Sequence, residues 1–257
     1  MTISSRLRGV VLAATLALAG AASQAQELVV SAAASLTNAF QAVGQAFERA
    51  RPGAKVTFNF AASGPLLAQI QQGAPVDVFA SADQETMNRA ASLIVAPTRA
   101  DFAANTLVLI LPSTSTQAPK ALGDLANPAF QRVSTGTPAT VPAGRYTMEA
   151  IEKAGLAAAL QPKWIYGESV RQVLNYVARG EVDAGFVYRT DAMVEHEKTR
   201  IALTVPTATP VTYPIAQVAA SRNAALANEF IAFVRGASGQ EILQRFGFSK
   251  PDARPAS

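Results

Sequence analysis

The stretch VVSAAASLTNAF, residues 29 to 40, joins the end of a predicted strand to the start of a predicted helix. Val29 and Val30 are β-branched, as in a buried strand, and from Leu36 onward the apolar residues follow helical spacing. The residues at the corner, 32 to 35, read Ala-Ala-Ala-Ser and are no larger than a hydroxymethyl group. A corner with such small side chains leaves space for a ligand to approach the backbone.

The first 25 residues have the pattern of a secretory signal peptide. Arg6 and Arg8 precede an apolar run from Val10 to Leu18, and a stretch of small residues leads to Ala25. We therefore expect export, with cleavage near Ala25. No later stretch reaches the roughly 18 uncharged apolar residues that a membrane-spanning helix needs, so a soluble mature protein is expected.

The remainder of the chain is nearly neutral and contains no cysteine. Taking the two signal-segment arginines from the 22 basic residues leaves 20, against 18 acidic residues. The basic residues are scattered, which argues against nucleic acid as a partner. Without cysteine there is no disulfide and no lipid-anchoring thiol, so the core alone must stabilise the fold. The length fits one large domain or two small ones.

Predicted strands and helices alternate along almost the whole chain, which is typical of α/β layers with largely parallel sheets. Two segments, 106–112 and the proline-punctuated 201–218, are places where the chain could pass between two lobes. Strands are predicted at 28–32, 55–61, 76–80, 106–112, 163–166, 184–188, 201–206 and 215–221, and helices at 36–50, 65–72, 84–93, 144–154, 169–179, 189–195 and 223–245.

Four predicted helices begin with small residues or caps that suit an anion site. They start near Ser35, Ser63, Pro142 and Ser169, where we expect Ser35 and Ser169 to act as helix caps. Free N–H groups and the positive end of the helix dipole favour an anion at such positions. Any one corner alone is better explained as an ordinary cap, so the interpretation depends on several corners together.

Seven motifs resemble, in order and spacing, the periplasmic molybdate-binding protein family of ABC importers. They are VSAAASLTNAF, FAASGPLLAQI, GAPVDVFASAD, VPAGRYTMEAI, SVRQVL, GFVYRTDA and QEILQRFGF. The resemblance implies a type II periplasmic binding fold, with lobe I at 26–107 and 209–257, lobe II at 108–208, two crossing strands and a ligand cleft between the lobes. It also implies a monomer in the periplasm that captures molybdate or tungstate and delivers it to the membrane permease of an ABC importer.

The resemblance further implies that the anion is held by neutral donors alone, without a cofactor or any protein ligand bound directly to molybdenum. Carried over by motif, Ser35 and Ser63 each offer a hydroxyl and an amide, Ala143 and Val170 offer backbone N–H groups, and Tyr188 offers its phenol. The chain departs from the pattern at residues 64 and 65, a glycine and a proline where small hydroxyl residues are expected. Proline has no N–H, so residue 65 cannot donate an outer contact to the anion through its backbone.

Other functions fit the sequence less well. An enzyme lacks the usual parts, because the chain has no cysteine, no G-x-S-x-G motif and one histidine, His196, which we expect on a solvated helix face. Asp77 and Asp83 could form an acid–base pair or a cation site, but we expect them to cap loops and support the first lobe. A ferric site would need clustered tyrosines, and a sensory role would need a second domain. The closest alternative is a binder of the same fold for another tetrahedral oxyanion such as sulfate.

Overall fold

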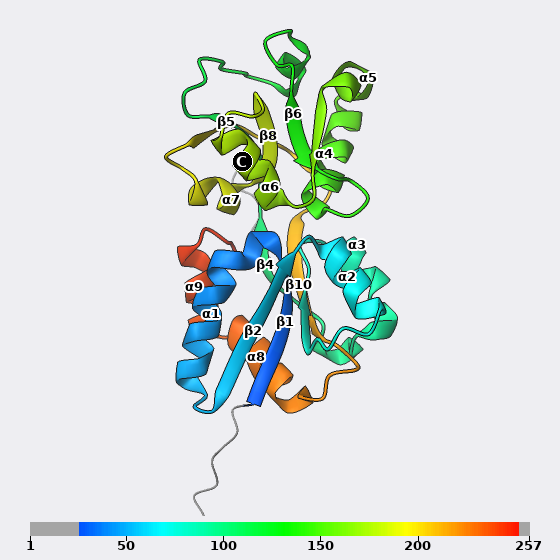
Figure 1. The fold of residues 1–257 in the computed structure, drawn as a ribbon, viewed down its shortest axis with the longest axis vertical. Coiled ribbons are helices and arrows are strands. Elements are labelled where there is room, and N and C mark those ends of the chain that lie inside the picture. The colour runs from blue at the N-terminus through cyan, green and yellow to red at the C-terminus, as the bar shows by residue number, and fades with distance from the viewer. Residues whose placement is uncertain (1–25, 252–257) are drawn as a thin grey trace, which may run out of the picture.

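Two lobes, each built on a five-stranded sheet, make up the described part of the protein (Figure 1). The computed structural model describes residues 26–251, and the predicted signal peptide lies outside them. The strands of lobe I are β1 (Gln26–Ala33), β2 (Ala54–Ala61), β3 (Val78–Ala80), β4 (Ala100–Asn105) and β10 (Val211–Gln217). Those of lobe II are β5 (Leu107–Pro112), β6 (Val133–Gly136), β7 (Trp164–Gly167), β8 (Ala184–Tyr188) and β9 (Thr199–Thr204). The predicted two-lobed α/β fold is confirmed.

Helices cover the sheets of both lobes. Those of lobe I are α1 (Thr37–Ala50), α2 (Ser63–Gln71), α3 (Gln84–Arg89), α8 (Ala224–Arg235) and α9 (Ala237–Arg245). Those of lobe II are α4 (Pro142–Lys153), α5 (Ala157–Leu160), α6 (Val170–Ala178) and α7 (Arg189–Val194). Within residues 26–251, none of the helices combines the length and the apolarity that crossing a membrane requires.

The strand directions bring the predicted corners together. In lobe I, with strand order β2-β1-β3-β10-β4, the three strands β1, β2 and β3 run parallel. In lobe II, with order β7-β6-β8-β5-β9, β6 runs parallel to both β7 and β8. Parallel strands end at the same sheet edge, and ligand sites in open α/β sheets lie at that edge. The corners after β1, β2 and β3 therefore lie together in lobe I, as do those after β6, β7 and β8 in lobe II.

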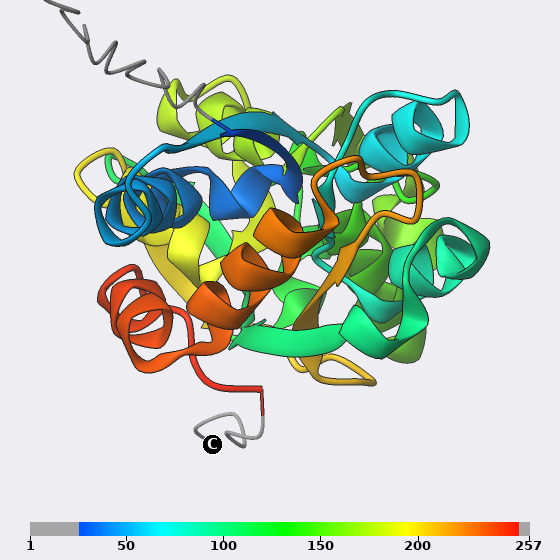
Figure 2. The same ribbon diagram turned by 90° about the horizontal axis from the view of Figure 1, so that it is seen from below.

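Packing on both sides of the lobe I sheet fixes these corners in place. Helices α1, α8 and α9 contact one another on one face, and α2 and α3 lie on the other (Figure 2). On the first face Phe40, Phe102 and Phe230 form an aromatic cluster with ring centroids 5.5 to 6.2 Å from that of Phe40. A separate apolar cluster that includes Phe79 and Met87 fills the second face. Burial of large apolar side chains on both faces holds the sheet rigid beneath the corners.

The chain passes between the lobes twice. It leaves the lobe I sheet at the end of β4, Asn105, and enters the lobe II sheet at Leu107. It returns between the end of β9, Thr204, and the start of β10, Val211. Both passages fall within the segments predicted to cross. The prediction for 106–112 needs one correction, because β5 lies wholly in lobe II and the strand that precedes the crossing, β4, was not predicted.

The predicted C-terminal helix over 223–245 is wrong, because the structure has two helices, α8 and α9, that meet at Gly236. The second helix folds back closely on the end of the first. A Cβ atom at Gly239 would lie 2.3 Å from the carbonyl oxygen of Phe233, so only glycine fits this approach. The helical spacing of apolar residues continues across 223–245 and therefore gave no sign of the turn at Gly236.

Candidate functional site

All five sequence-predicted site residues line one small cavity between the lobes. Ser35 and Ser63 come from lobe I, and Ala143, Val170 and Tyr188 come from lobe II. The remaining lining residues of the cavity are Ala33, Ala34, Ala62, Ala82, Val141 and Pro142. None of these lining side chains carries a charge. The wall is therefore made of small apolar groups, two hydroxyls, a phenol and backbone amides.

Helix starts account for the amides in this wall. Helix α2 begins at Ser63, α6 begins at Val170, and α4 begins at Pro142 with Ala143 as its second residue. The N–H groups of the first helical turn have no partner within the helix. Proline at the first position of α4 suits a helix start, since its missing N–H would be unpaired there in any case. The first turns of three helices therefore present donors to one cavity.

Ser35 does not cap a helix, so that prediction is wrong. The chain first makes a 3-10 turn over Ala34–Leu36, with no side-chain cap, and α1 begins only at Thr37. The Ser35 hydroxyl instead lies 3.0 Å from the phenolic oxygen of Tyr213, a buried residue of β10. Burial raises the pKa of Tyr213 well above its ordinary value, so this phenol stays protonated and can donate to Ser35. The serine can then direct its own proton toward the cavity.

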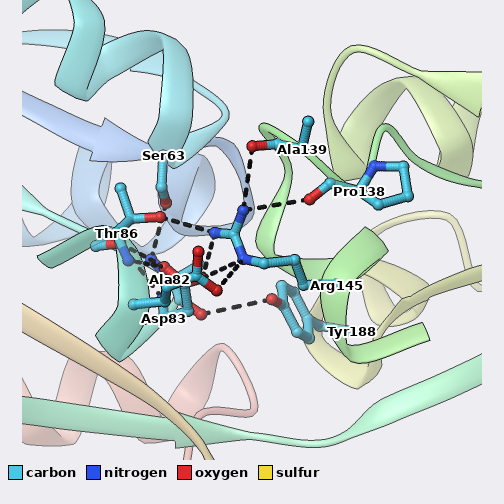
Figure 3. Close-up of polar contacts among 10 residues, drawn as sticks. Ser63, Ala82, Asp83, Thr86, Pro138, Ala139, Arg145 and Tyr188 are labelled. Carbon is cyan, nitrogen blue, oxygen red and sulfur yellow. Dashed lines mark hydrogen bonds and ion pairs between the residues drawn. The ribbon is translucent and has the colours of Figure 1, made fainter. Parts of the chain in front are cut away.

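The Ser63 hydroxyl is also held by an accepted hydrogen bond. Its Oγ accepts from the backbone N–H of Ala82 at 3.0 Å, and both residues are buried (Figure 3). A hydroxyl whose oxygen is engaged as an acceptor keeps its proton free to donate elsewhere. The arrangement therefore orients Ser63 as a donor facing the cavity.

Tyr188 supplies the long donor from the opposite lobe. It is the last residue of β8 and is buried. Its ring packs in a T-shaped arrangement with the ring of Tyr213, at a centroid separation of 5.8 Å. Its hydroxyl donates weakly, at 3.5 Å, to the carbonyl oxygen of Ala82 across the cleft (Figure 3). Burial raises the pKa of Tyr188 well above its ordinary value, so the phenol remains a donor at every physiological pH.

The supporting roles expected of three polar side chains are confirmed. Ser169 caps α6 by accepting from the N–H of Gln172 at 3.2 Å. Asp83 caps α3 by accepting from the N–H of Thr86 at 3.1 Å. Asp77 accepts from the N–H of Val29 at 2.8 Å and thereby ties a loop to β1. His196 is exposed as expected, but it lies in the turn after α7 and not on a helix face.

Sequence reasoning missed two arginines that reach from lobe II to lobe I. Arg145 of α4 forms an ion pair with Asp83 (Figure 3). Arg171 of α6 donates to Asn38 Oδ1 at 2.8 Å and to the carbonyl oxygen of Ser35 at 3.3 Å. Each follows a predicted site residue closely in the chain, but only its position after a helix start could have signalled a role.

The departure at residue 64 has a structural reason. The N–H of Gly64 donates across the cleft to the carbonyl oxygen of Thr140 at 3.0 Å. A Cβ atom at residue 64 would lie 2.6 Å from that same oxygen and 2.9 Å from the Thr140 Cα. Contacts this short are forbidden between backbone and side-chain atoms, so glycine permits the close approach of the two lobes. Neighbouring Pro65 contributes no N–H at this edge.

Comparison with known proteins agrees with this geometry. Residues 28–249 match the profile of the bacterial extracellular solute-binding proteins. The chain is 37% identical over 237 residues to the molybdate-binding protein ModA of Mycobacterium tuberculosis, an alignment that covers 91% of this chain and 88% of that protein.

Two solved structures share the architecture at low sequence identity. One is the periplasmic molybdate-binding protein of Azotobacter vinelandii, with a TM-score of 0.76 and 22% identity over 88% of this chain and 100% of that one. The other is the sulfate-binding protein SubI of Mycobacterium tuberculosis, with a TM-score of 0.78 and 18% identity over 88% of each chain. At these identities both show the fold alone. The family match and the identity to ModA show the family as well as the fold. The chain belongs to the bacterial extracellular solute-binding protein family, in its ModA branch, and is a binding protein, not an enzyme.

Proposed function

We propose that this protein captures molybdate or tungstate in the cavity between its lobes and delivers the anion to an ABC importer. The observation that carries the proposal is the cavity wall, which offers neutral donors from both lobes and no charged side chain. The ModA proteins that the chain resembles are named for molybdate binding, which favours the same ligand. The proposed donors are the Ser35 and Ser63 hydroxyls with their amides, the N–H groups of Ala143 and Val170, and the Tyr188 phenol.

A wall of neutral donors suits a fully deprotonated dianion. Molybdate carries no proton at neutral pH, so every group that faces it should donate, and a carboxylate in the wall would repel it. Phosphate, by contrast, keeps a proton that needs an acceptor. Hydrogen bonds to a charged partner contribute about 1.5 to 3 kcal/mol each, so several such donors support tight binding even after the entropy of association is subtracted.

Size is the feature that separates molybdate from sulfate in this proposal. The two ions share charge and shape, so discrimination must come from the radius of the cavity. Donors fixed on helix starts and sheet edges cannot follow a smaller anion inward, and sulfate would leave some of them too distant to bond. A sulfate binder of the same fold remains the alternative, although the likeness to the sulfate-binding protein concerns the fold alone.

The remaining features of the proposal concern location and partners. We infer that a signal peptide, cleaved near Ala25, exports the chain to the periplasm, where it acts as a monomer and docks on a membrane permease. We also infer that lobe I comprises 26–107 and 209–257 and lobe II comprises 108–208. The changes of sheet after Asn105 and after Thr204 support these boundaries to within a few residues, with Leu107 already paired in the lobe II sheet.

Calorimetric titration of the mature protein with a panel of oxyanions tests the ligand. Molybdate and tungstate should bind one ion per chain at micromolar concentration or below. Sulfate and phosphate should bind at least about 100-fold more weakly, a difference of roughly 2.7 kcal/mol. Equal affinity for sulfate and molybdate would favour the alternative oxyanion, and no binding by any member of the panel would reject the proposal.

Removing the serine hydroxyls tests the proposed donors. Ser35→Ala and Ser63→Ala should each weaken molybdate binding about 10- to 150-fold, since each loses one hydrogen bond to a dianion. Ser63→Ala should also lower stability by about 1 to 3 kcal/mol, because it leaves the buried N–H of Ala82 without its acceptor. Ala143→Gly keeps its backbone N–H and serves as the control. If both serine variants bind as tightly as the wild type, the donor assignment is wrong.

A further inference from the structure

Arg145 crosses the cleft beside the cavity and contacts the opposite lobe through an ion pair. Its Nε donates to Asp83 Oδ2 at 3.0 Å, and its Nη2 contacts the same oxygen and donates to Thr86 Oγ1 at 2.7 Å (Figure 3). The side chains of Arg145 and Asp83 are only 14% and 5% exposed. This is therefore a largely desolvated charge pair that joins α4 of lobe II to the start of α3 in lobe I.

Arg145 is oriented toward lobe I by its own lobe. Its Nη1 donates to the carbonyl oxygens of Pro138 and Ala139, at 3.3 and 3.4 Å, in the loop that precedes α4. Glu85 lies 3.2 Å from Nε, but its side chain is 58% exposed and a contact of that kind contributes little. The guanidinium is thus held in place on lobe II, and its buried countercharge belongs to lobe I.

The two oxygens of Asp83 have different sets of partners. Oδ1 accepts from the Ser81 hydroxyl at 3.2 Å and from the N–H of Thr86 at 3.1 Å, both within lobe I. Within residues 26–251, Oδ2 accepts hydrogen bonds from Arg145 alone. When the lobes separate, water can hydrate Oδ2. When they close, that water is lost and only Arg145 replaces it.

Asp83 also adjoins the wall of the proposed anion site, although it does not line the cavity itself. It follows Ala82, which lines the cavity and accepts from Tyr188 across the cleft. A bare carboxylate one residue from the cavity wall would repel a dianion in a poorly solvated site. Arg171 differs from Arg145, because its countercharge, Asp191, belongs to the same lobe and its contacts with lobe I are to neutral acceptors. Of these two arginines, only Arg145 gains its buried countercharge when the lobes meet.

We propose that Arg145 is the closure residue of this binding protein: its ion pair with Asp83 forms as the lobes close, offsets the carboxylate beside the anion and sets the rate of ligand release. The proposal rests on the proposed function, since it concerns how the same cleft retains its anion. It adds a charge pair outside the cavity to the neutral donors within it.

A double-mutant cycle with Arg145→Met and Asp83→Asn tests this pairing. Arg145→Met keeps the aliphatic stem but leaves a buried carboxylate beside the dianion, so the dissociation constant for molybdate should rise about 10- to 100-fold, mainly through faster release. Asp83→Asn keeps the α3 cap, because asparagine caps as well as aspartate, and it removes the charge. It should weaken binding less than Arg145→Met does. The double variant should bind better than Arg145→Met alone, because no unpaired charge remains.

The release rate separates this role from a merely structural one. Protein loaded with radioactive molybdate is chased with excess unlabelled molybdate, and the bound label is followed over time. Arg145→Met should release faster at a nearly unchanged association rate. Arg179→Met, which breaks the exposed pair of Arg179 with Glu181 within lobe II, should release at the wild-type rate. Losses that simply add in the double variant, or an unchanged release rate in Arg145→Met, would overturn the proposal.

Lobe closure gives a readout that does not depend on the identity of the anion. Because the chain has no cysteine, spin labels can be attached at exposed positions of the two lobes through Gln72→Cys and Lys153→Cys. The distance distribution of Arg145→Met should contain less of the short, closed separation than that of the wild type, with or without molybdate. Wild-type protein that binds no molybdate would reject the proposed function, whereas identical distributions for the wild type and Arg145→Met would reject the closure role.

Should Arg145→Met fold poorly, Arg145→Lys provides the second variant. Lysine keeps the positive charge but cannot make the two-nitrogen contact with one carboxylate. An intermediate release rate, between those of the wild type and Asp83→Asn, is expected. A rate equal to that of the wild type would show that the contact geometry plays no part and would overturn the assignment of Arg145.

Discussion

Arg171→Met should lower the free energy of unfolding by about 3 kcal/mol at pH 7, because it leaves the carboxylate of Asp191 buried without its countercharge. The Nε atom of Arg171 lies 2.6 Å from Asp191 Oδ1, and the aspartate side chain is completely buried. Neither of these two atoms has a well-aligned hydrogen bond, so the contact is an ion pair. Oδ2 accepts from the N–H of Tyr188 at 3.2 Å. Thermal unfolding should show a melting temperature roughly 6 to 12 °C below that of the wild type.

The pH dependence of this loss identifies its cause. Burial raises the pKa of Asp191 above its usual range, and the charge of Arg171 opposes that rise. A carboxyl with a folded pKa above its unfolded value of about 3.9 contributes stability that is full below that value and is lost as the pH rises through the folded pKa. Removing Arg171 raises the folded pKa further. The deficit of the variant relative to the wild type should therefore be largest near pH 7 to 8 and shrink toward pH 5.

Arg171→Met combined with Asp191→Asn is the matched control. The amide is neutral, and its oxygen can still accept from the N–H of Tyr188, so most of the lost stability should return and the pH dependence of the deficit should disappear. A deficit that is independent of pH and persists in the double variant would mean that Arg171 stabilises the fold through packing alone.

The corners of the site could be predicted from the sequence because each is a local feature. A β-branched run, a few small residues and a helical apolar period suffice to place a strand end and a helix start. The cap at Ser169 and the first helical residue Val170 were placed in this way. Motif order then indicated which corners belong together, and the parallel strands of each sheet bring them to one edge. The ligand roles of these residues remain predictions.

Two strands, β4 and β6, were not predicted because their residues are mostly small or polar. Strand β6 reads VSTG, yet Ser134 and Thr135 are fully buried. Their hydroxyls are satisfied by the carbonyl oxygen of Ile165 at 2.8 Å and by the Thr147 hydroxyl at 3.0 Å. Such hydrogen bonds make a polar strand tolerable in a core, but they depend on partners elsewhere in the chain. No local pattern could reveal them.

Contacts between the lobes could not be predicted from the sequence for the same reason, because the two partners of each contact lie far apart in the chain. Arg145 and Asp83 are 62 residues apart, and Arg171 and Asn38 are 133 apart. Hydrophobic periodicity and capping signals describe neighbours within a few residues, so they carry no information about which arginine meets which acceptor across a cleft. The glycine at residue 64 was noticed only as a departure from an expected pattern, and its partner, Thr140, lies in the other lobe.

Gly64→Ser should weaken molybdate binding by at least about 100-fold, because the loss of even one or two cross-cleft hydrogen bonds to a dianion costs roughly that much. The substitution restores the small hydroxyl residue that the sequence resemblance leads one to expect at this position. In this chain, however, a Cβ atom there would lie 2.6 Å from the Thr140 carbonyl oxygen of lobe II. Thr140 lies in the turn before α4, and the N–H groups of Thr140 and Val141 fix that turn by donating to the carbonyl oxygen of Thr137 at 3.1 and 2.8 Å. We therefore expect the lobes to stay apart. Ala143, Val170 and Tyr188 would then not reach an anion held by lobe I.

The ligand-free variant should fold normally, because the clash arises only when the lobes are closed. Calorimetry should show the loss of affinity, and small-angle scattering should show a smaller contraction on adding molybdate than in the wild type. Gly123→Ser is the matched control, since a Cβ atom there meets nothing within 4 Å and its backbone does not need glycine. Wild-type affinity and contraction in Gly64→Ser would mean that Thr140 can move away at little cost. The narrow approach at Gly64 would then be no part of how the cleft closes on its anion.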